Sequence, residues 1–180
     1  MEKIIIIGSG ARECYILMKL KSSLQQKEFE FITIGTNMNP YMFKQSNFIY
    51  VENYSLDTIL SLSVFKEDVL MVIIGPEAPI VNGIENNLRD LNIFTLSPSR
   101  ELSIIESSKI FTRTLIDECE TLNTKNPKFS FIKKDENQTV NREFVVDTIL
   151  KFKRLINNEV VIKKEGLCGG KGVFVEGDHF

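Results

Sequence analysis

Residues 4–10, Ile-Ile-Ile-Ile-Gly-Ser-Gly, indicate the architecture of the chain before any other feature. Four consecutive β-branched residues are typical of a strand that is buried on both faces, as strands of parallel sheets are. Gly8 ends this strand, and Leu17, Leu20 and Leu24 then follow at the spacing of one helix face. We therefore predict a strand, a glycine turn and a helix, which together form the first unit of an α/β domain.

Strands and helices alternate in the same way as far as Pro98. We predict further strands at residues 29–34, 48–51, 69–74 and 93–96. Helix faces are expected from Leu56, Leu60 and Val64, after Ser55 as N-cap, and from Val81, Ile84, Leu88 and Leu91. Residues 36–46 are expected to be a loop. This order implies a doubly wound parallel sheet with right-handed crossovers.

A smaller α+β region is predicted after Pro98. Its helix faces are expected from Phe111, Leu115, Cys119 and Leu122, and from Val145, Ile149, Phe152 and Ile156. Short strands are predicted at residues 129–132, 160–162 and 173–175, with the polar residues 123–128 as a joint. We therefore expect two domains, residues 1–98 and 99–180.

The composition excludes several classes of protein. Of the 180 residues, 43% are hydrophobic, and the net charge of −2 lacks the basic excess of a nucleic-acid binder. The apolar runs fall far short of the about 20 residues of a membrane span, and no secretory h-region is visible. We expect a cytoplasmic protein that binds neither nucleic acid nor membrane. Three scattered cysteines, Cys14, Cys119 and Cys168, and a single histidine, His179, argue against disulfides and a zinc site.

The first loop that could carry chemistry is Gly8-Ser9-Gly10, between a predicted strand and a predicted helix. A helix N-terminus presents free amides and the positive end of its dipole, which suit an anion such as phosphate. A dinucleotide fingerprint would need glycine where Glu13 stands and an acidic residue after the second strand, where Gly35 stands. NAD or FAD binding is therefore disfavoured, and a simple tight turn stays open as an alternative.

A second loop, Gly75-Pro76-Glu77, follows the fourth predicted strand. Ligands of open α/β sheets bind in the crevice at the carboxyl ends of the strands, so this loop is expected to face Gly8-Ser9-Gly10. Glu77 could there accept hydrogen bonds from ribose hydroxyls or from an amine. The alternative is an acidic side chain that only caps a solvated turn.

The third loop is glycine-rich and connects two predicted strands, over residues 166–172. It is not a Walker A loop, because Glu165 stands where that motif has glycine and Gly172 where it has Ser or Thr. Glycine-rich flaps between strands cover ATP phosphates in several nucleotide enzymes, and Lys163 and Lys171 could offset the triphosphate charge. A flexible hairpin with a basic tip is the alternative.

Four blocks in register make the chain resemble the N-terminal portion of phosphoribosylamine–glycine ligases, ATP-grasp enzymes of purine synthesis. They are residues 7–13 (Ile-Gly-Ser-Gly-Ala-Arg-Glu), 74–84 (opening Ile-Gly-Pro-Glu-Ala-Pro-Ile-Val), 106–111 (Glu-Ser-Ser-Lys-Ile-Phe) and 161–173 (ending Gly-Gly-Lys-Gly-Val). The resemblance implies a Rossmann-like pre-ATP-grasp domain, followed by the start of an ATP-grasp domain whose small lid covers about residues 125–180. It also implies ATP-dependent joining of glycine to 5-phosphoribosylamine.

The resemblance assigns binding residues but no catalytic or metal-ligating residue within the chain. The substrate-binding residues that it implies are Gly8, Ser9, Gly10, Arg12, Asn37, Gly75, Pro76 and Glu77. The ATP-binding residues that it implies are Lys109, Lys163, Gly166, Gly169, Gly170, Lys171 and Gly172. ATP is expected with Mg²⁺, whose ligands the family supplies from a later segment.

This sequence departs from the family pattern at several positions near the implied sites. Cys14 replaces a histidine, Ala11 and Ser107 replace glycines, Thr36 replaces the glycine of a turn, and Glu165 replaces an aspartate. We expect the chain alone to be inactive and to need a C-terminal ATP-grasp half. The alternative is a non-catalytic module that retains a phosphosugar or nucleotide site, and an oxidoreductase fragment is a third, weaker reading.

Overall fold

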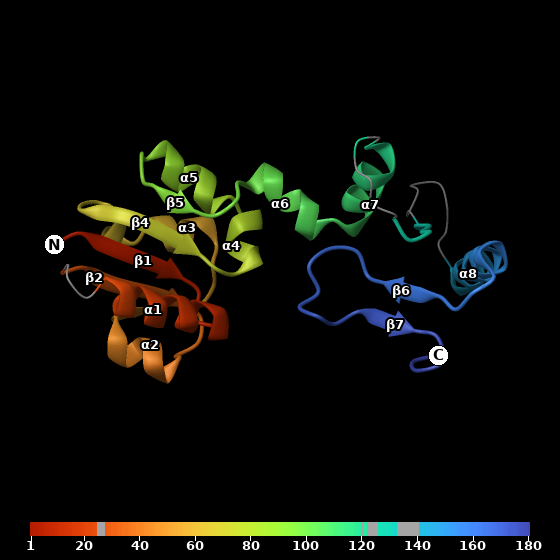
Figure 1. Cartoon of the computed structure of the whole chain (residues 1–180), viewed down its shortest axis with the longest axis horizontal. Coiled ribbons are helices and arrows are strands. Elements are labelled where there is room, and N and C mark those ends of the chain that lie inside the picture. Colours follow the sequence, from red (N-terminus) through yellow and green to blue (C-terminus); the bar gives the residue numbers. More distant parts are fainter. Residues whose placement is uncertain (25–27, 120, 122–125, 133–140) are drawn as a thin grey trace. The chain divides into compact units, whose positions relative to one another are not determined.

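The computed structural model describes residues 1–24, 28–119, 121, 126–132 and 141–180. The chain divides into two compact units, Met1–Ile104 (unit 1) and Ile105–Phe180 (unit 2), which are coloured from red to green and from green to blue in Figure 1. The boundary between the units falls shortly after Pro98, the residue at which the sequence suggests the end of the first domain. Each unit has its own sheet.

Unit 1 is built on a five-stranded parallel sheet with the strand order β3-β2-β1-β4-β5. The strands are β1 (Lys3–Ile7), β2 (Glu30–Gly35), β3 (Asn47–Tyr50), β4 (Val69–Ile74) and β5 (Thr95–Leu96). β1 lies between β2 and β4, with Ile5 opposite Ile32 on one side and Val72 on the other. The α/β class and the parallel sheet predicted from the sequence are confirmed.

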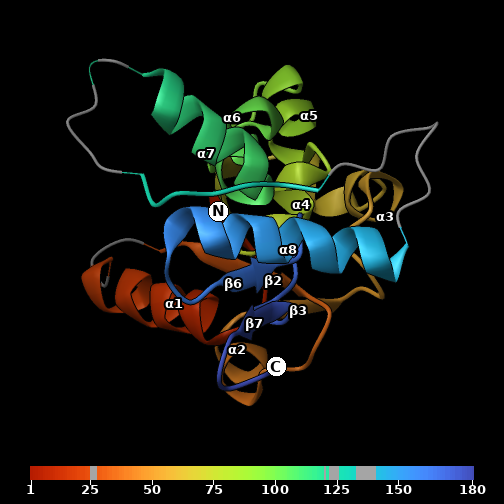
Figure 2. The same cartoon turned by 90° about the vertical axis from the view of Figure 1, so that its right-hand side faces the viewer.

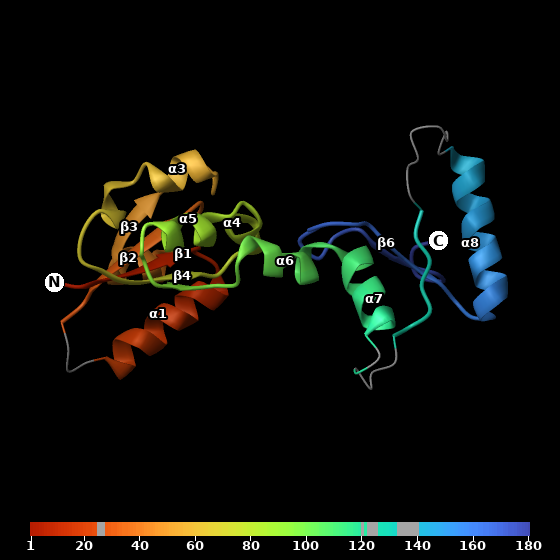
Figure 3. The same ribbon diagram turned by 90° about the horizontal axis from the view of Figure 1, so that it is seen from above.

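Successive residues of β1 enter two different cores, because neighbouring side chains of a strand point to opposite faces. Ile5 and Ile7 pack with residues of α3 (Leu56–Leu60), α4 (Glu77–Val81) and α5 (Ile84–Asp90). Ile4 and Ile6 pack with Leu17 of α1 (Ala11–Ser23) and Met42 of α2 (Pro40–Gln45). Figure 3 shows α1 on one side of the sheet and α3 and α5 on the other. This burial on both faces explains why the strand is apolar at every position.

Three expectations for unit 1 are wrong. The helix face expected from Leu56, Leu60 and Val64 is not one helix, because α3 ends at Leu60 and Val64 lies in a separate 3-10 turn, Ser63–Phe65. Residues 36–46 are not all loop, because α2 begins at Pro40 and Asn39 caps it by accepting from the amides of Tyr41 (3.1 Å) and Met42 (3.3 Å). The helix face expected from Val81 to Leu91 belongs to two helices, α4 and α5, which are separated at Gly83. Gly83 has a φ of 82°, a backbone angle that ends a right-handed helix. The predicted N-cap Ser55 is confirmed, since its hydroxyl accepts from the amide of Thr58 at 3.2 Å.

A helix that the sequence reading missed, α6 (Arg100–Ser107), contains the boundary between the units. Its first turn is fixed to α5 by Asn86, which accepts from the amide of Arg100 at 2.9 Å and donates to both carboxylate oxygens of Glu101 at 3.2 and 3.1 Å. These bonds from Asn86 are the main reason that the pKa of Glu101 is lowered to about 2.

Unit 2 contains α7 (Lys109–Glu118), α8 (Arg142–Ile156) and an antiparallel pair of β6 (Val161–Lys163) and β7 (Val173–Val175). Figure 2 shows α8 passing across this hairpin. Lys153 of α8 pairs with Glu176, just after β7, and this ion pair is the main reason that the pKa of Glu176 is lowered. Residues 129–132 are not a strand, contrary to the sequence prediction. The predicted joint at 123–128 lies mostly outside the described residues, as does Leu122.

Candidate functional site

The loops at the carboxyl ends of β1, β2 and β4 meet at one edge of the unit 1 sheet. The amide of Gly8 donates to the carbonyl of Ile34 at 2.8 Å, and the amide of Gly75 donates to the carbonyl of Ile7 at 3.0 Å. In Figure 1, β1 ends beside the first turns of α1 and α4. The structure therefore brings together the residues predicted to bind the substrate in these loops, Gly8, Ser9, Gly10, Arg12, Asn37, Gly75, Pro76 and Glu77.

Ser9 and Asn37 bind each other and thereby fix the first loop to the loop after β2. Ser9 is only 2% exposed, and its hydroxyl donates to Oδ1 of Asn37 at 2.7 Å. The side-chain amides of Asn37 and Asn39 both point to the carbonyl of Ser9, at 3.4 and 3.3 Å. The side chains of Ser9 and Asn37 thus shape the loop, and what the loop can offer to a ligand is its backbone.

The backbone amides at the start of α1 differ in what they already bind. The amide of Gly10 donates to Oε2 of Glu13 at 2.8 Å. Within the part of the chain that the structure describes, the amides of Ser9 and Ala11 donate to no protein acceptor. These two amides, the donor pair, lie at the positive end of the α1 dipole, which favours a negatively charged ligand.

Glu13 is a buried residue of this site that the sequence analysis did not select. It is only 3% exposed and occupies the space left by three glycines: a Cβ added to Gly8, Gly10 or Gly75 would lie within 2.8 Å of an atom of Glu13. The sequence motifs indicate only that Glu13 disfavours dinucleotide binding, because it stands where the fingerprint has glycine. A capping-box spacing, with glutamate three residues after the N-cap Gly10, was the available signal.

Arg12 and Glu77 connect the first turns of α1 and α4. Nη2 of Arg12 donates to Oε1 of Glu77 at 3.0 Å, and both side chains are partly exposed. The pKa of Glu77 lies below its ordinary value, chiefly because the carboxylate accepts from its own backbone amide and further because of Arg12, while partial burial opposes the shift. Glu77 is therefore a carboxylate at neutral pH, exposed enough to accept from a hydroxyl or a cationic amine.

In unit 2, the glycine-rich loop from Gly166 to Gly172 leads from β6 to β7. Four of its glycines, Gly166, Gly169, Gly170 and Gly172, have positive φ, a region that other residues rarely adopt. The loop is closed at its base by the amide of Lys164, which donates to the carbonyl of Gly172 at 2.8 Å. The side chains of Lys163 and Lys171 are exposed. The backbone conformation of this loop thus favours glycine at these four positions.

Hydrogen bonds connect the start of the glycine-rich loop to the N-terminus of α7. Oε1 of Glu165 accepts from the hydroxyl of Ser108 at 2.5 Å, and both carboxylate oxygens lie 3.4 Å from the amide of Ile110. Nζ of Lys109 donates to the carbonyl of Gly166 at 2.6 Å. The structure therefore brings Lys109, a predicted ATP-binding residue, to the loop predicted to cover ATP.

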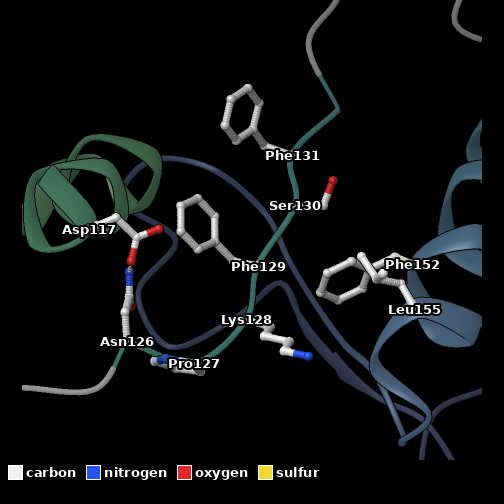
Figure 4. Close-up of a pocket in the computed structure, with 9 residues that line it drawn as sticks. All are labelled: Asp117, Asn126, Pro127, Lys128, Phe129, Ser130, Phe131, Phe152 and Leu155. Carbon is white, nitrogen blue, oxygen red and sulfur yellow. Dashed lines mark hydrogen bonds between the residues drawn. The ribbon is translucent and has the colours of Figure 1, made fainter.

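A separate hollow of about 490 Å³ lies in unit 2 between α7, residues 126–132 and α8. Figure 4 shows the rings of Phe129 and Phe131 and, opposite them, Phe152 and Leu155 of α8. None of the predicted site residues lines it. Aromatic and aliphatic side chains form part of its lining, and Asp117 and Lys128 are the charged residues in it.

In the described ranges, no three or more His, Cys, Asp or Glu side chains gather as a metal-binding group. No described helix combines the length and apolar character of a membrane span. All three cysteines are free thiols.

Comparison with known proteins gives a consistent result. Residues 2–106 match the family described as phosphoribosylglycinamide synthetase, N domain. The phosphoribosylamine–glycine ligase of Methanococcus vannielii is 32% identical over 180 residues, covering 98% of this chain and 37% of that protein. The ligase of Methanobrevibacter smithii is 29% identical over 178 residues, covering 98% and 36%. The chain thus spans little more than a third of the length of these relatives.

A solved structure supports the fold. N5-carboxyaminoimidazole ribonucleotide synthetase from Thermotoga maritima aligns with a TM-score of 0.61 and 18% identity, over 97% of this chain and 40% of that one. The family match extends from β1 to α6 and includes both Gly8-Ser9-Gly10 and Gly75-Pro76-Glu77. From this match and the strand-end geometry, we conclude that the chain belongs to the phosphoribosylglycinamide synthetase family, whose N domain forms its first unit.

Proposed function

We propose that this chain is the part of a phosphoribosylamine–glycine ligase that binds the phosphosugar substrate and covers ATP. In this proposal unit 1 binds the phosphate of 5-phosphoribosylamine at the amides of Ser9 and Ala11, with Glu77 toward its amine or hydroxyls. The glycine-rich loop of unit 2, with Lys109, Lys163 and Lys171, binds the ATP phosphates. The observation that carries the proposal is the donor pair at the start of α1 beside the Arg12–Glu77 pair.

The reaction that these residues would serve has two steps. The γ-phosphoryl group of ATP passes to the carboxylate of glycine, which gives glycyl phosphate and ADP. The amine of phosphoribosylamine then attacks the acyl carbon, forms the amide with loss of a proton, and releases inorganic phosphate. Lysine side chains at the glycine-rich loop stabilise charge on the transferred group. Mg²⁺ would add further neutralisation, and we expect its ligands, with most of the adenine pocket, in a C-terminal ATP-grasp half. The ligase would work in the cytoplasm.

The phosphate site can be tested with one substitution that removes a single amide. Ala11 is exposed and is the first residue of α1, a position at which proline fits the helix and lacks only the N–H group. Gly10 is already extended, as a residue before proline must be, with φ −78° and ψ −174°. Ala11→Pro should therefore leave the fold intact, and Ala11→Ser is the matched control that keeps the amide.

Calorimetry with ribose 5-phosphate, a stable phosphosugar, gives the readout. We expect saturable binding by the full chain and by Ala11→Ser. Binding should weaken about tenfold or more in Ala11→Pro, because a hydrogen bond to a charged group is lost. No binding of ribose 5-phosphate by the unsubstituted chain would overturn the proposal. Binding with no ATP-dependent product after adding a C-terminal half from a relative, glycine, phosphoribosylamine and Mg²⁺ would instead favour the non-catalytic module.

A further inference from the structure

Glu13 is a buried carboxylate at the mouth of the strand-end site, and neither the family match nor the sequence motifs assign it a role. We propose that Glu13 is a positioning residue of the phosphosugar site: its carboxylate occupies the Gly10 amide and so leaves the amides of Ser9 and Ala11 for the ligand phosphate. This inference rests on the proposed function, since it concerns the same site.

The side chain of Glu13 fills space that exists because three neighbouring residues are glycines. A Cβ on Gly75 would lie 2.1 Å from Oε1, a Cβ on Gly10 2.8 Å from Oε2, and a Cβ on Gly8 2.8 Å from Cγ. These glycines come from the loops after β1 and β4, so the absence of side chains in both loops leaves room for one carboxylate. A glycine loop that only approached a phosphate would not need to enclose a glutamate.

Starting the helix uses only one of the two carboxylate oxygens of Glu13. Oε2 satisfies the Gly10 amide, but Oε1 is buried and has no hydrogen-bond donor in the described structure. A buried acceptor without a donor is unfavourable, and a serine or threonine N-cap would start the helix without one. The long carboxylate side chain is therefore explained better by what it positions than by the helix it begins.

Glu13 is also linked to the other side of the site through Arg12. Nε of Arg12 lies 3.9 Å from Oε1 of Glu13, and Nη2 of the same guanidinium binds Glu77 at 3.0 Å. The Arg12 guanidinium thus lies near the buried carboxylate and hydrogen-bonds to Glu77. Glu13 is therefore next to both parts of the proposed site, and its bond to the Gly10 amide is the contact by which it positions the loop.

Two uncharged variants of similar length separate positioning from packing. Glu13→Gln keeps an oxygen that can accept from Gly10, whereas Glu13→Met fills the same space without a comparable acceptor. Glu85→Met is the matched control, because Glu85 is the other glutamate of unit 1 that is buried, 6% exposed, and it pairs with Arg89 within α5.

Calorimetric titration of the full chain with ribose 5-phosphate tests the proposal, with thermal unfolding measured in parallel. Glu13→Met should weaken binding about tenfold, and Glu13→Gln should restore it to within about threefold of the unsubstituted chain, as expected when a single acceptor positions the loop. Glu85→Met should leave binding unchanged.

Equal affinities for the unsubstituted chain and Glu13→Met would overturn the positioning role while leaving the proposed function intact. Equal weakening in Glu13→Met and Glu13→Gln, or in Glu85→Met, would also overturn it, because the loss would then not depend on the acceptor at position 13. Failure of the unsubstituted chain to bind ribose 5-phosphate would instead overturn the proposed function.

Discussion

Gly75 and Glu13 are in direct contact at the junction of β4 and α1: a Cβ on Gly75 would lie 2.1 Å from Oε1 of Glu13 and 2.5 Å from its Cγ and Cδ. Gly75 carries no positive φ in this structure, so its requirement for glycine comes from this contact rather than from its backbone angle. Each of the two residues therefore constrains what the other position can accept.

Gly75→Ala should destabilise unit 1 by about 1–3 kcal/mol, the usual cost of overpacking a filled site. The added methyl group must displace the Glu13 carboxylate and break its bond to the Gly10 amide. Urea unfolding of Gly75→Ala, Glu13→Ala and the double variant measures the coupling. We expect the double variant to be more stable than the sum of the single losses predicts; additive losses would show that the contact is not responsible.

The stability of unit 1 should depend on the ionisation of Glu77. Its pKa is lowered in the folded chain, so the stabilisation from this carboxylate is complete above its ordinary pKa of 4.5 and is lost as the pH falls through the lower folded value. Because Glu77 is partly exposed, we expect the effect to be below about 1 kcal/mol. Unfolding free energies of the chain and Glu77→Gln should differ most near neutral pH and converge in acid; a constant difference across this range would contradict the assignment.

The carboxylate of Glu165 should slow hydrogen exchange in the first turn of α7. It accepts from Ser108 and lies beside the amide of Ile110, so Glu165→Ala removes a cap. Loss of a cap of about 1 kcal/mol should speed hydrogen exchange at the Ile110 amide about fivefold. Glu159→Ala, an exposed glutamate next to β6, is the control and should change nothing at Ile110. Unchanged exchange in Glu165→Ala would mean that Ser108, whose hydroxyl accepts from the amide of Phe111 at 3.1 Å, caps the helix without Glu165.

The sequence predicts those parts of the fold in which one local pattern determines the outcome. The apolar run of β1 and the N-cap Ser55 are such parts, since burial on both faces and a free first-turn amide leave little choice. The α2 helix was missed because Asn39 and Pro40 favour a loop as well as a helix start, and only the packing of Met42 against β1 decides between them. The break at Gly83 was missed because the apolar spacing continues across it.

The candidate site, too, has features that the sequence predicts and features that it does not. The predicted loops do come together, because the carboxyl ends of neighbouring parallel strands must lie at one edge of the sheet. The position of Glu13 was not predictable from its own neighbourhood, because it depends on the missing side chain of Gly75, which is far away in the sequence. The hydrogen bonds from Ser108 and Ile110 to Glu165 were likewise not predictable, because they depend on how two distant segments of unit 2 pack.

Asn39 offers a final test, because one side chain serves both a helix and the site. Its Oδ1 caps α2, while its Nδ2 lies 3.3 Å from the carbonyl of Ser9. Asn39→Ala should cost about 1 kcal/mol, the usual value of an N-cap, measured by urea unfolding. Asn39→Ser should recover most of this loss, because serine is an equally good N-cap. Serine has no side-chain amide, so this variant lacks the contact between Nδ2 of Asn39 and the carbonyl of Ser9. If the serine variant were as unstable as the alanine variant, the contact with Ser9 would be the source of the stability, and the start of α2 would depend on the loop rather than on its cap.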